Sequence, residues 1–231
     1  MALICLSLAM EDLKDVVEVA NRVDSDLVEV RLDYLRDASD LSGLAGIRKP
    51  VISTCMPTWE GGSCKVLEDV RMGILESSLK HSDYVTIELD TKEKLREGLI
   101  AKAKAAGVKV IVAHHDFEST PPIIEILKTL EREMIVGADI GKVAYMPKER
   151  KDVLNLMDAL YEWDDRWKGK KPAIALSMGA MGSITRLMAP MYGSYLTFGC
   201  AERGKESAPG QLTVDELKTM LGLLCDEDSD S

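Results

Sequence analysis

Residues 109–117 read KVIVAHHDF and residues 135–146 read IVGADIGKVAYM, and both runs have the apolar composition of buried β-strands. Between them, apolar residues recur with the spacing of one helix face, at Ile123, Ile126, Leu127 and Leu130. This stretch therefore predicts a strand, a helix and a second strand in succession, which is the repeating unit of an α/β fold.

The same alternation continues along the whole chain of 231 residues. Strand-like runs are predicted at residues 3–8, 27–35, 50–56, 84–90, 109–117, 135–146, 172–178 and 195–200. Further helical stripes are predicted at Leu13, Val16, Val17 and Ala20, at Leu67, Val70, Ile74 and Leu75, at Leu154, Met157, Leu160 and Tyr161, and at Leu217, Met220, Leu221 and Leu224.

Eight strands that alternate with helices, in a chain of this length, predict a (β/α)8 TIM barrel. The single domain is expected to span residues 1–225, and the acidic, polar residues 226–231 are expected to form a frayed tail. A doubly wound open sheet is the alternative α/β architecture, but no GxGxxG motif follows the first strand.

The composition limits the class of protein and its partners. An apolar share of 46% with 29% charged residues is ordinary for a soluble globular protein. The five cysteines are odd in number and form no CxxC pair, which argues against a disulfide framework or a zinc site and favours a reduced, cytoplasmic compartment. No apolar run approaches the ~18 residues of a membrane span. The net charge of −10 argues against nucleic acid as a partner, although one or two arginines in a pocket can still bind an anionic small molecule.

Charged residues alternate with apolar residues in the second and fourth predicted strands. One face of the second strand carries Glu29, Arg31 and Asp33, and one face of the fourth carries Glu88 and Asp90. The outer face of a barrel strand packs on helices and must be apolar, so these charges are expected to point into the barrel. A single buried Glu–Arg pair would be a structural ion pair, but this many charges on inner faces indicates a functional site.

Lys142 lies in the middle of the sixth predicted strand. Because strand side chains alternate, Val143 and Tyr145 are expected on one face, and Lys142 with Ile140 and Ala144 on the other. No obvious acidic partner stands on that face, so desolvation is expected to lower the pKa of Lys142 and give a neutral amine that attacks a carbonyl. The alternative is a lysine near a strand end whose ammonium group reaches water.

His115 closes the fifth predicted strand on the face that it shares with Ile111 and Ala113. The fifth and sixth strands are neighbours in the predicted barrel, so His115 and Lys142 are expected within the width of one substrate. A nucleophilic amine beside a general acid/base is the equipment of Schiff-base chemistry. His114 has the opposite parity and is expected to pack outward.

Six short motifs occur in an order that resembles one known family. They are EVRLD at 29–33, EGG at 60–62, HHDF at 114–117, KVAYMP at 142–147, the segment SMG…SITRL within 177–187, and SAPGQ at 207–211. From the first strand to the last helix, the chain is similar to type I 3-dehydroquinate dehydratase. The resemblance implies a (β/α)8 barrel, often a homodimer, that acts on 3-dehydroquinate in the shikimate pathway and needs no metal or cofactor.

The resemblance also implies catalytic roles for three matching residues. Lys142 would form an imine with the C3 ketone of the substrate. His115 would remove a C2 proton and then return a proton to the departing C1 hydroxyl. Glu60 would orient that histidine, which fits the general need for a third group behind a base.

Five further residues would bind the substrate. Arg186 would hold the substrate carboxylate bidentately, as guanidinium geometry favours. Glu29 and Arg31 would bind ring hydroxyls. Ser207 and Gln211 would close the pocket from the loop after the eighth strand, and the same loop would act as a mobile lid.

Three positions depart from the family pattern. Met56 stands where an arginine is frequent, Thr86 where an aspartate is usual, and Ala113 where a small polar residue precedes the paired histidines. These changes bear on substrate affinity rather than on the reaction.

Two other functions remain open from the sequence. A class I Schiff-base aldolase would use the same lysine on a sugar phosphate, with the phosphate at the glycines of segment 179–183. However, Arg186 and Gln211 suit a carboxylate, and the base of such an aldolase would more often be a carboxylate or a tyrosine. A non-catalytic barrel would leave Lys142 and the inner charges unexplained.

Overall fold

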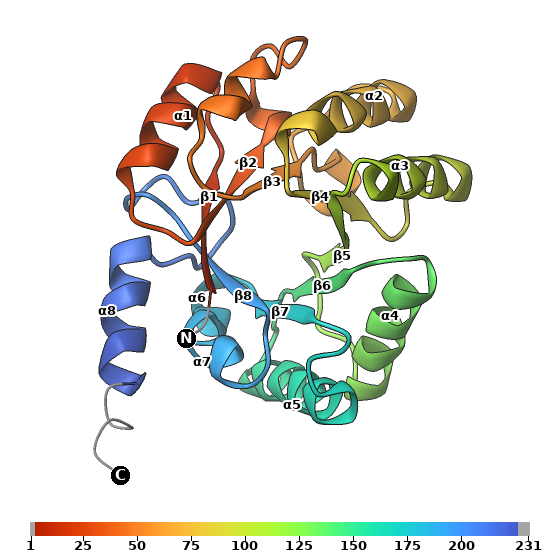
Figure 1. Cartoon of the computed structure of the whole chain (residues 1–231). Coiled ribbons are helices and arrows are strands. Elements are labelled where there is room, and N and C mark those ends of the chain that lie inside the picture. The colour runs from red at the N-terminus through yellow and green to blue at the C-terminus, as the bar shows by residue number, and fades with distance from the viewer. Residues whose placement is uncertain (1–2, 226–231) are drawn as a thin grey trace.

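The barrel is seen in a computed structural model that describes residues 3–225. Its eight parallel strands form a ring, and the helices lie outside them (Figure 1). Neighbouring strands pair in the order β7-β6-β5-β4-β3-β2-β1-β8, and a bridge between Ala173 and Ser194 brings β7 to the start of β8. The predicted (β/α)8 barrel is therefore confirmed.

All eight predicted strands are present, most of them shortened at the ends. The strands are β1 (Leu3–Leu8), β2 (Leu27–Arg31), β3 (Val51–Thr54), β4 (Tyr84–Glu88), β5 (Lys109–Asp116), β6 (Ile140–Tyr145), β7 (Ala173–Ser177) and β8 (Leu196–Gly199). The α-helices are α1 (Leu13–Arg22), α2 (Glu68–Ser78), α3 (Glu93–Ala105), α4 (Ile123–Ile135), α5 (Arg150–Trp167), α6 (Gly179–Gly182), α7 (Thr185–Met191) and α8 (Val214–Cys225). The short 3-10 helices are η1 (Leu32–Tyr34), η2 (Ser42–Gly46), η3 (Thr58–Glu60) and η4 (Leu79–His81). Within residues 3–225, no helix is both long and apolar enough to cross a membrane.

Two strand predictions extend too far by several residues, and one connection contains a helix of another type. The second strand ends at Arg31, where the chain turns into η1. The sixth strand begins only at Ile140, because α4 runs on to Ile135 and Gly137 then turns the chain with φ of 108°. The connection between β2 and β3 contains η1 and η2 where an α-helix was expected. The predicted acidic tail, residues 226–231, lies outside the described residues.

The helical stripe predicted for α2 is partly wrong. Leu67 and Val70 are exposed, whereas Arg71 and Met72 are buried. The Arg71 guanidinium forms an ion pair with the carboxylate of Glu88, which is itself buried in the barrel wall. A buried charge needs this partner, so the ion pair, rather than the apolar pattern, sets which face of α2 turns inward.

The stripes predicted for α5 and α8 are also partly wrong. Leu154 and Tyr161 are exposed on α5, which instead buries Val153, Leu156 and Trp163 beside the predicted Met157 and Leu160. On α8, Leu217 and Leu221 are buried, while Met220 and Leu224 are exposed. Apolar residues stand on two adjacent faces of these helices, so periodicity alone does not identify the buried one.

Strand alternation is confirmed where it decides the position of Lys142. Val143 and Tyr145 belong to the apolar cluster that β6 shares with α4 and α5, while Ile140 and Ala144 belong to the cluster inside the barrel. The interior cluster fills the N-terminal end of the barrel with side chains from successive strands, among them Cys5, Leu27, Ile52, Ile111, Ile140, Ile174 and Leu196. This apolar plug leaves the C-terminal strand ends as the open mouth, where such barrels carry their chemistry.

Glu133 of α4 is buried behind β6, on the outer side of the barrel wall. Neither of its carboxylate oxygens has a hydrogen-bond partner among the described residues, and one lies only 2.7 Å from where a Cβ on Gly141 would stand. Burial raises the pKa of Glu133 well above its ordinary value, which favours the protonated carboxyl in the folded protein.

Compared with wild type at the same pH, Glu133→Gln is expected to have a higher free energy of unfolding. This difference is expected to grow as the pH rises above about 4.3, the ordinary pKa of an unfolded glutamate. Above that pH the native state holds a proton on Glu133 that the unfolded state releases, so the contribution of Glu133 to wild-type stability falls with rising pH by at most about 1.4 kcal/mol per pH unit. Urea unfolding at several values between about pH 5 and pH 8 measures the difference. Glu125→Gln, an exposed change on the same helix, is the control. Equal pH slopes for Glu133→Gln and wild type would show that the buried carboxyl is ionised in the folded protein.

Candidate active site

A cavity of about 560 Å³ opens at the C-terminal ends of the strands. Of the eight residues predicted for the site, seven line this cavity: Glu29, Arg31, His115, Lys142, Arg186, Ser207 and Gln211. The eighth, Glu60, lies behind His115 at the end of η3. The structure therefore brings together residues that are up to about 180 positions apart in the chain, as the closed barrel requires.

Lys142 reaches the cavity from β6 and is only 5% exposed, which excludes the alternative of an ammonium group extended into water. Its Nζ lies 3.7 Å from Oε1 of Glu29 and 4.5 Å from the centre of the Phe198 ring. The face of β6 that carries Lys142 has no acidic residue, as expected, but Glu29 reaches Lys142 from β2 on the opposite wall of the barrel and supplies an acidic partner. Glu29 is in turn held by hydrogen bonds from Oγ of Ser7 (2.6 Å) and Oγ1 of Thr54 (3.0 Å).

His115 lies on the strand next to Lys142. Lys142 pairs in register with Ala113, and His115 pairs with Ala144, so both side chains face the cavity two residues apart along neighbouring strands. Nδ1 of His115 is 2.7 Å from Oε2 of Glu60, and the His115 backbone N–H donates to the same oxygen at 3.2 Å. This contact fixes the ring and leaves Nε2 for chemistry in the cavity.

Burial sets the charge of the His115–Glu60 pair. Burial, together with the nearby positive charges of Lys142 and Arg31, lowers the pKa of His115 well below its ordinary value. Burial, reinforced by the charge of Glu88, raises the pKa of Glu60 to about 9. Both shifts favour the uncharged forms, so His115 is a neutral imidazole at physiological pH and can accept a proton.

Arg186 enters the cavity from α7 and is 2% exposed. Its guanidinium donates to three backbone carbonyls, those of Gly210 (3.0 Å), Pro209 (3.2 Å) and Phe198 (3.4 Å), and it belongs to no ion pair among the described residues. Burial lowers the pKa of Arg186 to about 10, so the group is still charged at neutral pH. A guanidinium has five N–H donors, so two remain for the bidentate grip of one carboxylate.

Arg31 is held by a carboxylate, whereas Arg186 is held by backbone carbonyls. Its guanidinium makes two hydrogen bonds to the carboxylate of Asp33, at 2.9 and 2.7 Å, and lies 5.0 Å above the Tyr34 ring. A third contact runs to the backbone carbonyl of Ser207 at 3.4 Å. Because its charge is already matched by Asp33, Arg31 suits hydroxyl groups better than it suits an anion.

The loop after β8 covers one side of the cavity. Oγ of Ser207 donates to Oγ of Ser7 at 2.7 Å, and Gln211 bonds back to Ser207 through both of its amide atoms. At Gly210, φ is 79° and a Cβ would stand 2.2 Å from the carbonyl oxygen of Gly179, so only glycine fits this close approach. The loop therefore rests against the barrel mouth, and its movement as a lid stays a prediction.

Some site residues were missed or misplaced by sequence reasoning. Ser7 donates a hydrogen bond to Glu29, and the ring of Phe198 lies against Lys142. Strand alternation could have predicted both, because Ser7 shares a face of β1 with the inward Cys5, and Phe198 shares a face of β8 with the inward Leu196. Asp90 was expected inside, but β4 ends at Glu88 and Asp90 is exposed beyond it. Glu88 faces inward but serves Arg71 as a structural ion pair.

The three departures from the family pattern have different surroundings. Met56 lines the cavity. Thr86 is buried, and its Oγ1 lies 2.9 Å from Oγ1 of Thr54, the hydroxyl that donates to Glu29, which places Thr86 one step away from Glu29. Ala113 is buried between Glu88 and Lys142 in the register of the sheet.

Comparison with known sequences gives a consistent result. Residues 4–228 match the family described as type I 3-dehydroquinase. A 3-dehydroquinate dehydratase of Methanosarcina barkeri is 37% identical over 229 residues, which cover 95% of this chain and 93% of that protein. A 3-dehydroquinate dehydratase of Listeria monocytogenes is 38% identical over 223 residues, which cover 92% of this chain and 87% of that protein.

Solved structures agree with the sequence comparison. The crystal structure of 3-dehydroquinate dehydratase from Geobacillus kaustophilus superimposes with a TM-score of 0.89 at 31% identity, covering 99% of this chain and 93% of that one. Type I 3-dehydroquinate dehydratase from Clostridium difficile, in a structure with covalently modified comenic acid, gives a TM-score of 0.88 at 31% identity, covering 98% of this chain and 93% of that one. The 3-hexulose-6-phosphate synthase of Salmonella typhimurium, at 18% identity and a TM-score of 0.56, shares the fold alone.

Proposed function

Since the chain belongs to the type I 3-dehydroquinase family, we propose that Lys142, His115 and Glu60 are the residues that carry its reaction. The enzyme is a hydro-lyase that dehydrates 3-dehydroquinate to 3-dehydroshikimate, a step of the shikimate pathway, and this assignment decides against the aldolase alternative. The observation that most supports the residue roles is that a buried lysine amine and a neutral histidine face one cavity from neighbouring strands.

In the proposed mechanism, the Lys142 amine attacks the C3 carbonyl, and the carbinolamine loses water to give an iminium. His115 takes the C2 proton while the C–H electrons move toward the iminium nitrogen. His115 then gives a proton to the C1 hydroxyl, which leaves as water. Hydrolysis of the product iminium restores Lys142, so the net change is the loss of one water from the substrate. Glu60 keeps the His115 ring in place through Nδ1 during both proton transfers.

Borohydride reduction in the presence of 3-dehydroquinate, followed by peptide mass spectrometry, tests the proposal. Reduction of the imine is expected to leave a dehydroshikimate-derived adduct on the peptide that contains Lys142, lighter by one water than the corresponding dehydroquinate adduct. The Lys142→Ala protein is the control and should remain unmodified. An adduct on another lysine, or none at all, would contradict the role of Lys142.

The substrate is held in this proposal by the remaining predicted residues. Arg186 binds the carboxylate through its two free donors, and Glu29 and Arg31 bind ring hydroxyls. Ser207 and Gln211 close the cavity from the loop after β8. The hydrogen bonds of Ser207 to Ser7 and Gln211, and the absence of an ion pair at Arg186 among the described residues, support these assignments.

Arg186→Lys is expected to raise KM strongly, because a point ammonium group cannot replace a planar fork that bonds two carboxylate oxygens in parallel. Part of the loss should appear in kcat, since a carboxylate that is held loosely misplaces C2 against His115. Steady-state kinetics on 3-dehydroquinate measures both effects. Lys170→Arg, an exposed change in the turn after α5, is the control and should be silent. An unchanged kcat/KM in Arg186→Lys would show that the carboxylate is held elsewhere, with Arg31 the next candidate.

The proposal also includes a cytoplasmic homodimer. The cysteines whose side chains the structure describes, Cys5, Cys55, Cys64 and Cys200, are free and buried, which fits a reducing compartment. Exposed apolar side chains on α5, on α7 and directly after α7, at Leu154, Tyr161, Met191 and Tyr192, offer a face for a second copy. Light scattering after size-exclusion chromatography gives the mass of the assembly and thereby tests the dimer.

A further inference from the structure

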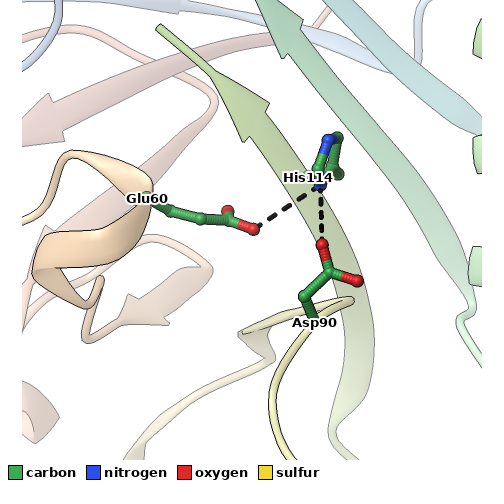
Figure 2. A group of neighbouring side chains, drawn as sticks. All are labelled: Glu60, Asp90 and His114. Atoms are coloured by element: carbon green, nitrogen blue, oxygen red, sulfur yellow. Dashed lines mark ion pairs between the residues drawn. The ribbon is translucent and has the colours of Figure 1, made fainter.

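Three side chains converge on the side of Glu60 that faces away from His115. They come from η3, from the turn after β4 and from β5, and they are Glu60, Asp90 and His114 (Figure 2). Nδ1 of His114 lies 3.7 Å from Oε1 of Glu60 and 3.4 Å from Oδ2 of Asp90, and the three atoms all lie within 4.8 Å of one another. This group lies outside the set of residues that line the substrate cavity.

The group contains polar atoms that lack partners. Glu60 is 97% buried (3% exposed), and its Oε1 points at His114 without a hydrogen-bond partner among the described residues. Nδ1 of His114 is likewise a buried atom without a partner in that part of the chain. Unpartnered buried polar atoms destabilise a fold unless an ion or a ligand satisfies them.

The spacing suits a small metal ion better than it suits direct hydrogen bonds. A tetrahedral zinc ion bonds nitrogen and carboxylate oxygen at about 2.0–2.2 Å, which places its ligands about 3.3–3.6 Å apart. One imidazole and two carboxylates are ligands that zinc accepts, and three protein ligands leave one position for water. The ring of Tyr145 packs against His114 and Arg132 contacts Asp90 only through Oδ1, so the ligand atoms stay free.

We propose that Oε1 of Glu60, Oδ2 of Asp90 and Nδ1 of His114 bind one Zn²⁺ ion, and that this ion inhibits the enzyme. Asp90 is half exposed, so it gives the ion a path from solvent. The bound ion shares Glu60 with His115, because Oε1 ligates the metal while Oε2 contacts the imidazole. Binding of zinc releases the proton of Glu60, and a carboxylate that is bound to zinc no longer adjusts to the proton transfers of His115, so turnover falls while substrate binding at Arg186 is preserved. The inhibitory part of this inference rests on the proposed role of Glu60, whereas the binding part does not.

Isothermal titration of the substrate-free protein with ZnCl₂ tests the binding site. Wild type is expected to bind one ion, and both Asp90→Asn and His114→Asn, which are close in shape to the native residues, are expected to weaken binding by at least about tenfold. Asp158→Asn removes an exposed carboxylate from α5 and is the matched control, with wild-type binding expected. The site would be overturned if wild type failed to bind zinc. It would also be overturned if wild type, Asp90→Asn and His114→Asn bound zinc equally, because the ion would then bind elsewhere, for example at the cysteines.

Kinetics with added zinc tests the inhibition. Zinc is expected to lower kcat of the wild type with little change in KM, and Asp90→Asn is expected to keep wild-type activity without zinc and to resist inhibition. Full activity of zinc-saturated wild type would overturn the inhibitory role. If the metal-free protein fails to dehydrate 3-dehydroquinate, the proposed function fails, but the titration still decides the binding site.

Discussion

Replacing Lys142 with alanine is expected to abolish turnover of 3-dehydroquinate while the barrel stays folded. The side chain is buried in the cavity wall, and its amine is the only group proposed to form the covalent intermediate. Loss of a covalent nucleophile costs several orders of magnitude in rate, because no other group lowers the barrier to C2 deprotonation in the same way. Steady-state assays over long incubation times, with circular dichroism to verify folding, measure the effect.

Two further variants make the Lys142 result decisive. Lys142→Met keeps an apolar side chain of similar length beside Phe198. Its inactivity would show that the loss of activity in Lys142→Ala comes from the missing amine and not from the empty space that alanine leaves in the packing. Lys109→Ala removes an exposed lysine from the start of β5 and should leave the rate unchanged. Turnover near the wild-type rate in a folded Lys142→Ala protein would exclude Schiff-base catalysis by this residue.

Replacing His115 with alanine is expected to slow turnover by at least about 10²–10⁴-fold, the usual worth of general acid–base catalysis. The Lys142 amine should still form an imine, because its attack on C3 does not depend on the base that later removes the C2 proton. Borohydride trapping is therefore expected to give an adduct that retains the C1 hydroxyl, so its mass exceeds that of the wild-type adduct by one water. The mass difference separates a failure of proton transfer from a failure of imine formation.

His114→Ala is the comparison for His115→Ala. His114 points out of the barrel toward Tyr145 and reaches Glu60 only at 3.7 Å, whereas His115 contacts Glu60 at 2.7 Å and lines the cavity. A smaller rate loss is therefore expected for His114→Ala. If His114→Ala lowers the turnover rate more than His115→Ala does, then His114, and not His115, is the histidine that acts in the cavity.

Local rules predicted the barrel and the facing of its strands. Alternation along β2 and β6 placed Glu29 and Lys142 inside, because the side-chain period of a strand follows from backbone geometry alone. It could not show that these two residues meet, since their contact crosses the barrel between strands that are not neighbours. The same limit explains why the buried Arg71 was overlooked: besides Glu68 on its own helix, Arg71 pairs with the fully buried Glu88 of another element, and that contact is not visible in the local sequence.

Residues on irregular segments depended on the family resemblance. Glu60 lies on η3 and Ser207 and Gln211 lie on the loop after β8, where no periodicity tells which side chain faces the cavity. The hydrogen bonds that place them, such as that between Ser207 and Ser7, join segments from opposite ends of the chain. Such contacts form only when the barrel closes, so patterns within a short segment of sequence cannot predict them.

The tight approach of Gly210 to Gly179 limits how the cavity can be redesigned for new substrates. A side chain at Gly210 would clash with the carbonyl of Gly179 and push the backbone of Gly210 away, and the Gly210 carbonyl is one of the three that accept hydrogen bonds from Arg186, so a mutational library should keep this glycine fixed. Ala208 and Met56 line the cavity from the loop after β8 and from the segment after β3, and they offer positions where side-chain volume and polarity can vary. Changes at these two positions leave Arg186, the proposed carboxylate anchor, untouched, so the substrates expected within reach of directed evolution are cyclic ketones that keep a carboxylate.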